Sequence, residues 1–304
     1  MGRNVILTHR FYKTRRNAAL FKYFFGGLER RFGFETRYTD IVDLPLDTKT
    51  VLAYAVPHFR QYNFLVEGLV NLDPNVCLIV WTADLHCGDY MSEIDTKVCI
   101  ANTKRIFERA DLILSGFDGR MKSTYSSYLH KYKYFPWGFI PQENYENLKF
   151  NNNPIMRCLM IGHVNKEYCP MREAIKQRAK EKYVIHYVNG QYRGDQYALL
   201  LNKYFGGITD VGNDDIIHAK HFEIPATGSL LFSRRTRLLD EAGFVPYTHY
   251  VPVTKANWFS VINRVIKKAK EYRRVRLKGM KFVRKYHGFN NRMAWLEKTI
   301  KEMM

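Results

Sequence analysis

KYFGGITDVGNDDIIHAKHFEIPATGSLLF, residues 203–232, is the stretch that decides the fold. It reads as an apolar strand, a loop rich in Gly and Asp, a short helix with Lys220 and Glu223, and a Gly turn into a second apolar strand. Transitions from a loop into a helix present free backbone N–H groups, which bind phosphate. A carboxylate one turn inside the helix suits a vicinal diol, because its two oxygens can accept two hydroxyl hydrogens. The stretch therefore predicts a nucleotide site in an α/β fold.

The rest of the chain alternates apolar runs with amphipathic ones, which is typical of parallel sheets covered by helices. In the first half we expect strands at 5–8, 50–56, 76–81, 112–115 and 133–137, and helices at 18–32, 62–72 and 97–109. In the second half we expect strands at 157–161, 183–188, 206–210 and 229–232, and helices at 171–181, 196–203 and 258–269. The last helix continues into a basic run. The polar, turn-rich segment 139–154 between the two sets is a plausible hinge.

Charge is the second strong signal. The formal net charge is +19, and residues 151–304 carry a surplus of +15, with 28 basic and 13 acidic side chains. Residues 264–285 contain eleven basic residues and one acid, Glu271. Such a field favours polyanions: nucleic acid, an anionic membrane face or an acidic glycan.

Cysteine content and hydropathy indicate the compartment. The five cysteines are an odd number without a C-x-x-C pair, which argues against a disulfide framework and for a reducing cytosol. No apolar run approaches the roughly 20 residues that span a bilayer, and the N-terminus reads as a first strand rather than a signal. We therefore expect a cytoplasmic protein, in the host cytoplasm if it is encoded by a phage.

Residues 220–228, KHFEIPATG, carry a resemblance to a known family. They resemble the K/R-x-F-E-I-x-A-x-G run of group 1 glycosyltransferases, especially the branch similar to the CgeB spore-maturation proteins. More weakly, the resemblance extends over the second half, to Gly162 after a strand, Tyr168, Arg172 and the tail at 289–295. It implies the GT-B fold, in which two Rossmann-like domains face a central cleft. The expected domains are residues 1–140 for the acceptor, residues 155–285 for the donor, and a C-terminal helix at 286–304 that crosses back.

The resemblance also implies a donor site for a nucleotide diphosphate sugar, most readily a UDP-sugar. Glu223 would bind ribose, while Lys220 and Arg172 would neutralise the diphosphate. Larger relatives carry two acidic residues with seven positions between them; Asp215 and Glu223 have that spacing, with Asp in place of the usual Glu, so Asp215 would contact the sugar. The remaining donor-binding candidates are Gly162, Tyr168, His218, Thr227, Gly228 and Ser229. For Lys220 and Arg172 a solvated helix charge is the alternative.

A metal or a permanent cofactor is not expected. The D-x-D signature of metal-dependent glycosyltransferases is missing from the sequence, where Asp214 and Asp215 are adjacent. His218 and His221 lie three apart and could resemble a metal pair, but no third ligand accompanies them. Contact of one of them with phosphate or a uracil-like base is the favoured interpretation.

Acceptor residues are expected in the first half. Asp84 and His86 follow an apolar strand, where a general base would lie, although Asp84 could equally cap the following helix. His58 is a further candidate after another strand. If the reaction retains configuration, these residues only position the acceptor. The loop after the first strand combines cations with aromatics, which suits phosphate and base contacts: Arg10, Tyr12, Lys13, Arg15 and Arg16.

These observations predict a glycosyltransferase that acts on a polyanionic acceptor, with DNA carrying a hydroxylated base as the favoured one. One alternative is an envelope or spore-coat glycosyltransferase whose basic helix touches anionic lipid. A second is a nucleic-acid-binding protein that has kept the fold without catalysis.

Overall fold

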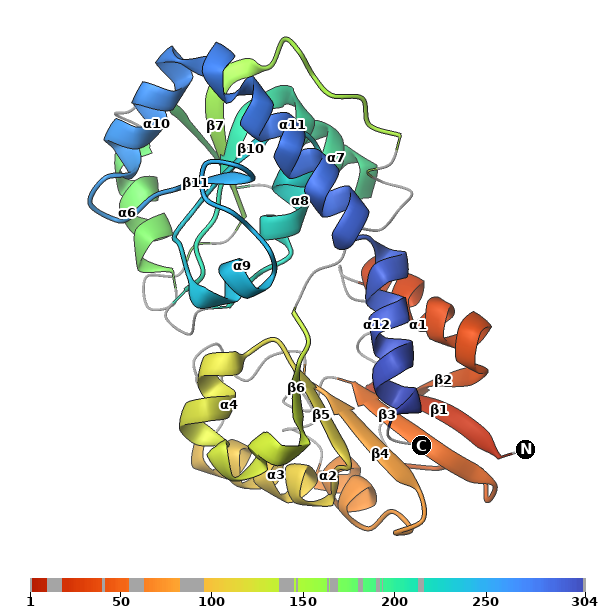
Figure 1. Ribbon diagram of the computed structural model, residues 1–304. Coiled ribbons are helices and arrows are strands. Elements are labelled where there is room, and N and C mark those ends of the chain that lie inside the picture. Colours follow the sequence, from red (N-terminus) through yellow and green to blue (C-terminus); the bar gives the residue numbers. More distant parts are fainter. Residues whose placement is uncertain are drawn as a thin grey trace. The chain divides into compact units, whose positions relative to one another are not determined.

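The computed structural model describes residues 2–9, 18–39, 42–54, 63–82, 96–136, 145, 147–162, 164, 169–179, 183–189, 192, 194–212 and 216–302. The chain divides into two compact units, residues 1–136 and 137–304. Each unit contains one parallel sheet with helices, so the predicted α/β class is confirmed (Figure 1). The finer domain boundaries expected at 140, 155 and 285 stay predictions.

The first unit is built on a six-stranded sheet in the order β2-β1-β3-β4-β5-β6. Its strands are β1 (Arg3–His9), β2 (Phe34–Thr39), β3 (Thr48–Tyr54), β4 (Cys77–Trp81), β5 (Leu112–Ser115) and β6 (Tyr132–Tyr134). Its helices are α1 (Ala18–Phe32), α2 (Asn63–Val70), α3 (Thr96–Arg109), α4 (Asp118–Thr124) and the 3-10 helix η3 (Ser126–Lys131). Figure 1 shows α2 and α3 on one face of the sheet and α1 on the other. The inner strands β3 and β5 are almost entirely buried, with Lys49 near the start of β3 as the exposed exception, as expected where helices cover both faces.

The second unit is built on a five-stranded sheet in the order β11-β10-β9-β7-β8. Its strands are β7 (Ile155–Ile161), β8 (Ile185–Val188), β9 (Tyr204–Ile208), β10 (Leu230–Ser233) and β11 (Tyr250–Pro252). Its helices are α6 (Pro170–Ala179), α7 (Gly194–Lys203), α8 (Lys220–Ala226), α9 (Arg237–Glu241), α10 (Trp258–Lys267), α11 (Ala269–Tyr286) and α12 (Phe289–Lys301). The expected single helix from 258 into the basic run is instead two, because the chain leaves helical geometry at Lys268.

Strand order reverses between β7 and β9. The chain steps from β7 outwards to β8 and then returns past β7 to β9. In open parallel sheets this reversal opens a crevice beyond the carboxyl ends of the two strands. The residues that follow β7 and β9 are therefore placed to form a ligand site.

Glycines in β9 permit close packing. A Cβ on Gly206 would lie 2.6 Å from the Phe232 ring and 2.8 Å from the Leu230 carbonyl oxygen. A Cβ on Gly207 would meet Ile224 of α8 at 3.0 Å. The missing side chains let α8 approach the sheet, which brings the residues of this short helix near the carboxyl end of β7.

Two arginines of α11 anchor α8 from its other end. Arg276 is 4% exposed; its Nε donates to the Gly228 carbonyl at 2.9 Å and its Nη2 to the Asn151 carbonyl at 3.0 Å. Arg284 donates from Nε to the Ala226 carbonyl at 2.9 Å and from Nη2 to the Leu148 carbonyl at 2.9 Å. Both side chains thus satisfy carbonyls at the end of α8, where the helix itself leaves acceptors unpaired.

His287, between α11 and α12, is buried and neutral. Its Nδ1 faces the Arg292 Nη2 at 3.0 Å, so it must accept, and its Nε2 then donates to the Ala242 carbonyl at 2.9 Å. Burial, with the nearby Arg292 charge, lowers the pKa of His287 to about 3. In an unfolded chain the pKa of a histidine lies near its ordinary value of 6.5.

We expect His287 to make the protein acid-sensitive. Below about pH 6.5 the His287 imidazole binds a proton in the unfolded chain but not in the folded chain. The free energy of unfolding therefore falls as pH drops towards 3. Denaturation of His287→Gln between pH 4.5 and 6.5 should show a slope smaller by up to about 1.4 kcal/mol per pH unit. His130→Gln, at an exposed position, is the control and should keep the wild-type slope; equal slopes in all three proteins would contradict this account.

Gly279 should be intolerant of a methyl group. A Cβ there would lie 2.6 Å from the His249 carbonyl oxygen, which is a backbone atom and cannot relieve the contact by changing rotamer. Although alanine favours helix, we expect Gly279→Ala to destabilise the protein by about 1–3 kcal/mol because α11 must shift. Gly26→Ala in α1 is the matched control, since its Cβ would meet only the flexible end of Arg30 at 3.2 Å. The control should be neutral or slightly stabilising in the same thermal unfolding measurement.

Candidate functional site

Two cations converge where β7 ends. Gly162 follows β7 with φ +95°, and a Cβ there would lie 3.6 Å from the Lys220 Nζ and 4.0 Å from the Arg172 Nη2. Lys220 opens α8 and Arg172 lies in the first turn of α6, so residues far apart in sequence meet at the crevice where strand order reverses. The glycine leaves open space between two positive charges, as an anion site requires.

Arg172 is fixed by backbone yet keeps unused hydrogen-bonding capacity. Its side chain is 6% exposed, and its Nη2 donates to the Ile161 carbonyl at 2.8 Å. Its buried Nε has no hydrogen-bond partner among the residues that the structure describes. A buried donor without a partner is costly, and an anion in the crevice would satisfy it.

The ammonium of Lys220 is destabilised by its surroundings. Burial lowers its pKa to about 8, with the Arg172 charge as the second cause. The Glu223 carboxylate and the Cys169 thiol act in the opposite direction but do not restore the ordinary value. The site is therefore short of negative charge, which a bound anion would supply.

Glu223 lies one turn further along α8, beside two tyrosines. Burial raises the pKa of its carboxyl, while Lys220 and the hydroxyls of Tyr197 and Tyr145 partly offset that shift. The buried Tyr197 hydroxyl approaches the carboxylate without completing a well-formed hydrogen bond. Proximity to Glu223 and burial together raise the pKa of the Tyr145 phenol well above its usual value. A carboxylate flanked by hydroxyls can accept both hydrogens of a diol.

Asp210, which follows β9, holds α6 in place. It is 2% exposed, accepts the Val211 N–H at 2.9 Å and lies 3.8 Å from the Arg234 Nε. The Met171 N–H in the first turn of α6 also donates to it. Burial raises the pKa of Asp210 and these partners lower it. Asp210 thus positions the helix that carries Arg172 rather than adding a ligand group.

One expectation about α8 is wrong. We predicted free backbone N–H groups at its start, but the His221, Phe222 and Glu223 N–H groups donate to the His218 and Ala219 carbonyls at 2.9 Å. The preceding turn satisfies these donors because it already has helical geometry. Side-chain cations, rather than these three amides, are therefore what the site offers to an anion.

Histidines of this segment do not act alike. His221 is fully buried; its Nδ1 accepts the His218 N–H at 3.0 Å and its Nε2 lies 2.9 Å from the Ser233 Oγ. Burial lowers its pKa to about 3, so it is a neutral structural group. His218 is partly exposed and stacks on His221 with ring centroids 6.0 Å apart. Of the pair, His218 is the one with exposed surface.

Thr227, Gly228 and Ser229 are engaged within the fold. The Thr227 Oγ1 donates to the Ile224 carbonyl at 2.7 Å, and the Ser229 Oγ lies 2.6 Å from the Leu201 carbonyl. Gly228 has φ +81°, and a Cβ there would meet Phe150 at 3.0 Å and the Met280 Sδ at 3.2 Å. Helix capping and packing explain these three residues without a ligand.

Other predicted residues lie outside the described part of the chain. These are the catalytic candidates Asp84, His86 and Asp215, the donor candidate Tyr168, and the acceptor candidates Arg10, Tyr12, Lys13, Arg15, Arg16 and His58. Their roles stay predictions. Two residues that the sequence analysis did not single out, Tyr145 and Tyr197, join the site. Neither belongs to a recognisable motif.

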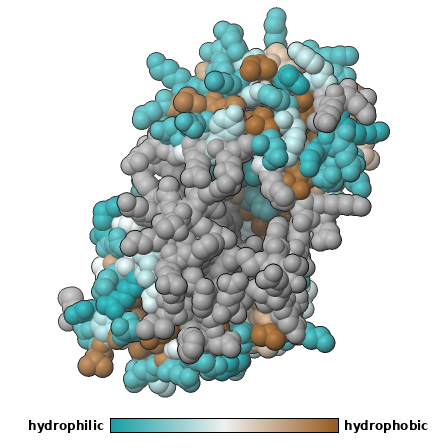
Figure 2. Space-filling view, turned by 180° about the vertical axis from the view of Figure 1, so that it is seen from behind, coloured by the Kyte–Doolittle hydropathy of each residue, from teal (hydrophilic) through white to brown (hydrophobic). Residues whose placement is uncertain are grey.

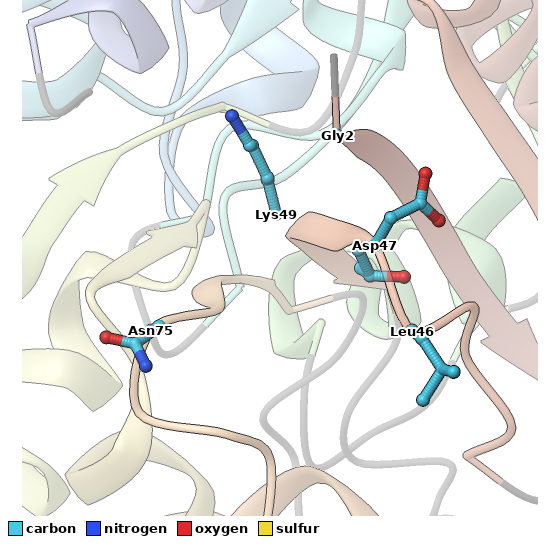
Figure 3. Close-up of a pocket in the computed structure, with 6 residues that line it drawn as sticks. Gly2, Leu46, Asp47, Lys49 and Asn75 are labelled. Carbon is cyan, nitrogen blue, oxygen red and sulfur yellow. The ribbon is translucent and has the colours of Figure 1, made fainter.

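A depression in the first unit is a poor alternative site. It has a volume of about 730 Å³ and is lined by Gly2, Leu46, Asp47, Thr48, Lys49 and Asn75 (Figure 3). These residues precede β1 and β4 or begin β3, and so lie at the amino ends of the strands, opposite the end where ligands bind in open parallel sheets. Among the described residues no cluster of three metal-binding side chains occurs, and no helix is long and apolar enough to cross a membrane.

Comparisons with known proteins concern the fold and the class of protein. Residues 153–298 match the model of a family described as glycosyl transferase-like. A comparison with curated proteins found no match. Solved structures similar over the whole chain include sucrose-phosphate synthase from Thermosynechococcus elongatus, with 9% identity, TM-score 0.65 and 99% of each chain covered.

Two further similar structures contain UDP. One is an α-glucosyltransferase in complex with UDP and a 13-mer DNA, with 11% identity, TM-score 0.59, and 99% of this chain and 100% of that one covered. The other is HepE from Anabaena with UDP and glucose, at 8% identity and TM-score 0.60, with the same coverage. The two sheets of the chain thus have the GT-B fold, and the match to the glycosyl transferase-like model covers residues 153–298.

Proposed function

We propose that the protein is a glycosyltransferase that takes its sugar from a nucleotide diphosphate sugar, with a UDP-sugar as the favoured donor and no metal required. One observation carries the proposal: Lys220 and Arg172 converge on Gly162, with Glu223 one turn away on the same helix as Lys220. The family match over residues 153–298 supports the enzyme class. Assignment to the branch similar to the CgeB proteins rests on the run at 220–228 and belongs to this proposal.

Each group has a defined task in such a reaction. Lys220 and Arg172 stabilise the charge that develops on the departing diphosphate, in a partly buried site where fixed cations act strongly. Glu223, with the Tyr145 and Tyr197 hydroxyls beside it, binds the ribose diol. Asp215 contacts the transferred sugar, and Asp84 or His86 serves the attacking hydroxyl.

For the acceptor we favour a polyanion, namely DNA carrying a hydroxylated base. Residues 151–304 have a net formal charge of +15, which attracts phosphates. The similar α-glucosyltransferase was solved with a 13-mer DNA, which supports this choice without establishing it. Arg10, Tyr12, Lys13, Arg15, Arg16 and His58 would contact the acceptor, in the cytoplasm.

Replacing Glu223 should remove nucleotide binding. In a thermal-shift screen against UDP, GDP, CDP and their sugars, we expect one nucleotide series to stabilise the wild type. At a ligand concentration of about 100 Kd the gain is about 2.7 kcal/mol. Glu223→Gln keeps the size of the side chain but removes a charged acceptor, so the shift should shrink strongly.

Glu241→Gln is the matched control for this screen. Glu241 is an exposed carboxylate that pairs with Arg237 within α9 and is not one of the residues assigned to the donor site, so its variant should respond to nucleotide as the wild type does. If no nucleotide stabilises the wild type, the transferase proposal fails, and a nucleic-acid-binding protein without catalysis takes its place.

Lys220 should make donor binding depend on pH. Its pKa of about 8 means that the free protein loses this ammonium as pH rises through 8, so diphosphate affinity should fall between about pH 7 and 9. Calorimetric titration with UDP measures this. Lys220→Arg keeps its charge throughout and should flatten the profile. Unchanged pH dependence in that variant would contradict the assignment.

Removing the same ammonium should stabilise the free protein. The folded chain releases the Lys220 proton at lower pH than the unfolded chain does. The free energy of unfolding therefore increases as pH rises from about 8 towards 10.5. Lys220→Met should therefore raise the melting temperature at pH 7 while losing the stabilisation by UDP. A lower melting temperature would show that Lys220 is stabilising instead.

A further inference from the structure

Five cations form one stripe along α11. Lys270, Arg274, Lys278, Lys281 and Lys285 follow the spacing i, i+4, i+8, i+11 and i+15, which places them on one side of a helix. The stripe is about 22 Å long at 1.5 Å per residue. The positions that α11 buries, Arg276, Gly279, Met280 and Val283, fall on its opposite side. The stripe therefore faces away from the sheet of its own unit.

All five side chains are exposed and lack acidic partners in the part of the chain that the structure describes. None of them has an ion pair with a described residue. The nearest acid on the helix, Glu271, pairs instead with Lys268 at 3.3 Å. Hydrophilic residues also dominate the surface of the second unit in the view of Figure 2.

Such a stripe costs helix stability. Like charges at i and i+4 each destabilise a helix by about 0.2–0.5 kcal/mol, whereas a face that is merely solvated can alternate acids with bases. Here Lys270 and Arg274, Arg274 and Lys278, and Lys281 and Lys285 are all like-charged neighbours. The repulsion is relieved when a polyanion lies along the stripe.

The composition of the helix selects the kind of polyanion. Sites for single-stranded nucleic acid add aromatic side chains on which bases stack, and anchors for membranes add exposed apolar residues. On α11, Tyr286 is the one large apolar side chain that is exposed, and it lies at the end with Lys285 over its ring at 5.0 Å. A straight row of cations without such neighbours fits regularly spaced backbone phosphates.

We propose that the stripe on α11 binds the phosphate backbone of double-stranded nucleic acid, independently of sequence. The proposal rests on the proposed function and deepens it, because it assigns a surface that would hold a DNA acceptor while its base is modified. The contacts would supply affinity and orientation, and base recognition would come from elsewhere.

The test compares full-length variants for binding of a labelled DNA duplex across a salt series. K270Q/K278Q/K281Q removes three charges of the stripe. K49Q/K104Q/K133Q removes three exposed lysines of the first unit and is the matched control, since both variants have the same net charge. We expect the stripe variant to bind about tenfold or more weakly at about 100 mM salt, with a log–log salt slope smaller by about 2–3, and the control to resemble the wild type.

Further arms separate the possible outcomes. K270R/K278R/K281R keeps the charges and should bind as the wild type does. If the stripe variant binds the duplex as tightly as the control variant does, the proposed role of the stripe is wrong. It is also wrong if the wild type binds phosphatidylcholine–phosphatidylserine vesicles or a single strand more tightly than the duplex. If the wild type does not bind the duplex at all, the proposal that DNA is the acceptor is wrong as well. Stabilisation by UDP tests the transferase separately, because the stripe lies outside the donor residues.

Discussion

The repulsion between Lys220 and Arg172 is the constraint on which the site depends. Both cations point at the space that Gly162 leaves open, and burial lowers the pKa of Lys220 to about 8. A fold keeps such a pair together only when other contacts fix the elements that carry it. Asp210 holds the start of α6, and arginines of α11 hold the end of α8. The sheet, these two helices and α11 thus cooperate to maintain an arrangement that an anion would relieve.

Much of the fold could be predicted because its inner strands are continuous apolar runs. Leu112–Ser115 has the bounds that the sequence indicates, and the other predicted strands agree within a few residues, but the short buried strand β11 was not predicted. By contrast, β2 was missed since FETRYT is a mostly polar edge strand with one fully buried residue, Phe34. The break at Lys268 was also missed, because neither Gly nor Pro marks it, and apolar spacing continues across it.

The part of the site that a sequence motif carries, namely Lys220 and Glu223, could be predicted because their spacing sets their positions on one helix. Lys220 and Glu223 lie one turn apart in the run at 220–228, and the structure brings Arg172 and Gly162 to them. Sequence could not tell that Thr227 and Ser229 direct their hydroxyls to backbone carbonyls, since the same hydroxyls could equally bind phosphate. Nor could it find Tyr145 and Tyr197, which reach Glu223 from separate segments through tertiary packing.

The positive charges of the second unit act over two different distances. A pair of cations of which Arg172 is buried and Lys220 partly buried acts over a few ångströms in a medium of low polarizability, so it selects a compact anion and is little affected by salt. The exposed stripe on α11 is screened within about 8 Å at physiological salt, so its cations act on a polymer only through many simultaneous contacts. A protein that must hold a small diphosphate and a long polyanion needs both kinds of charge, in separate places. The crevice pair and the five cations of the stripe are seven of the 28 basic residues behind the surplus of +15 in residues 151–304.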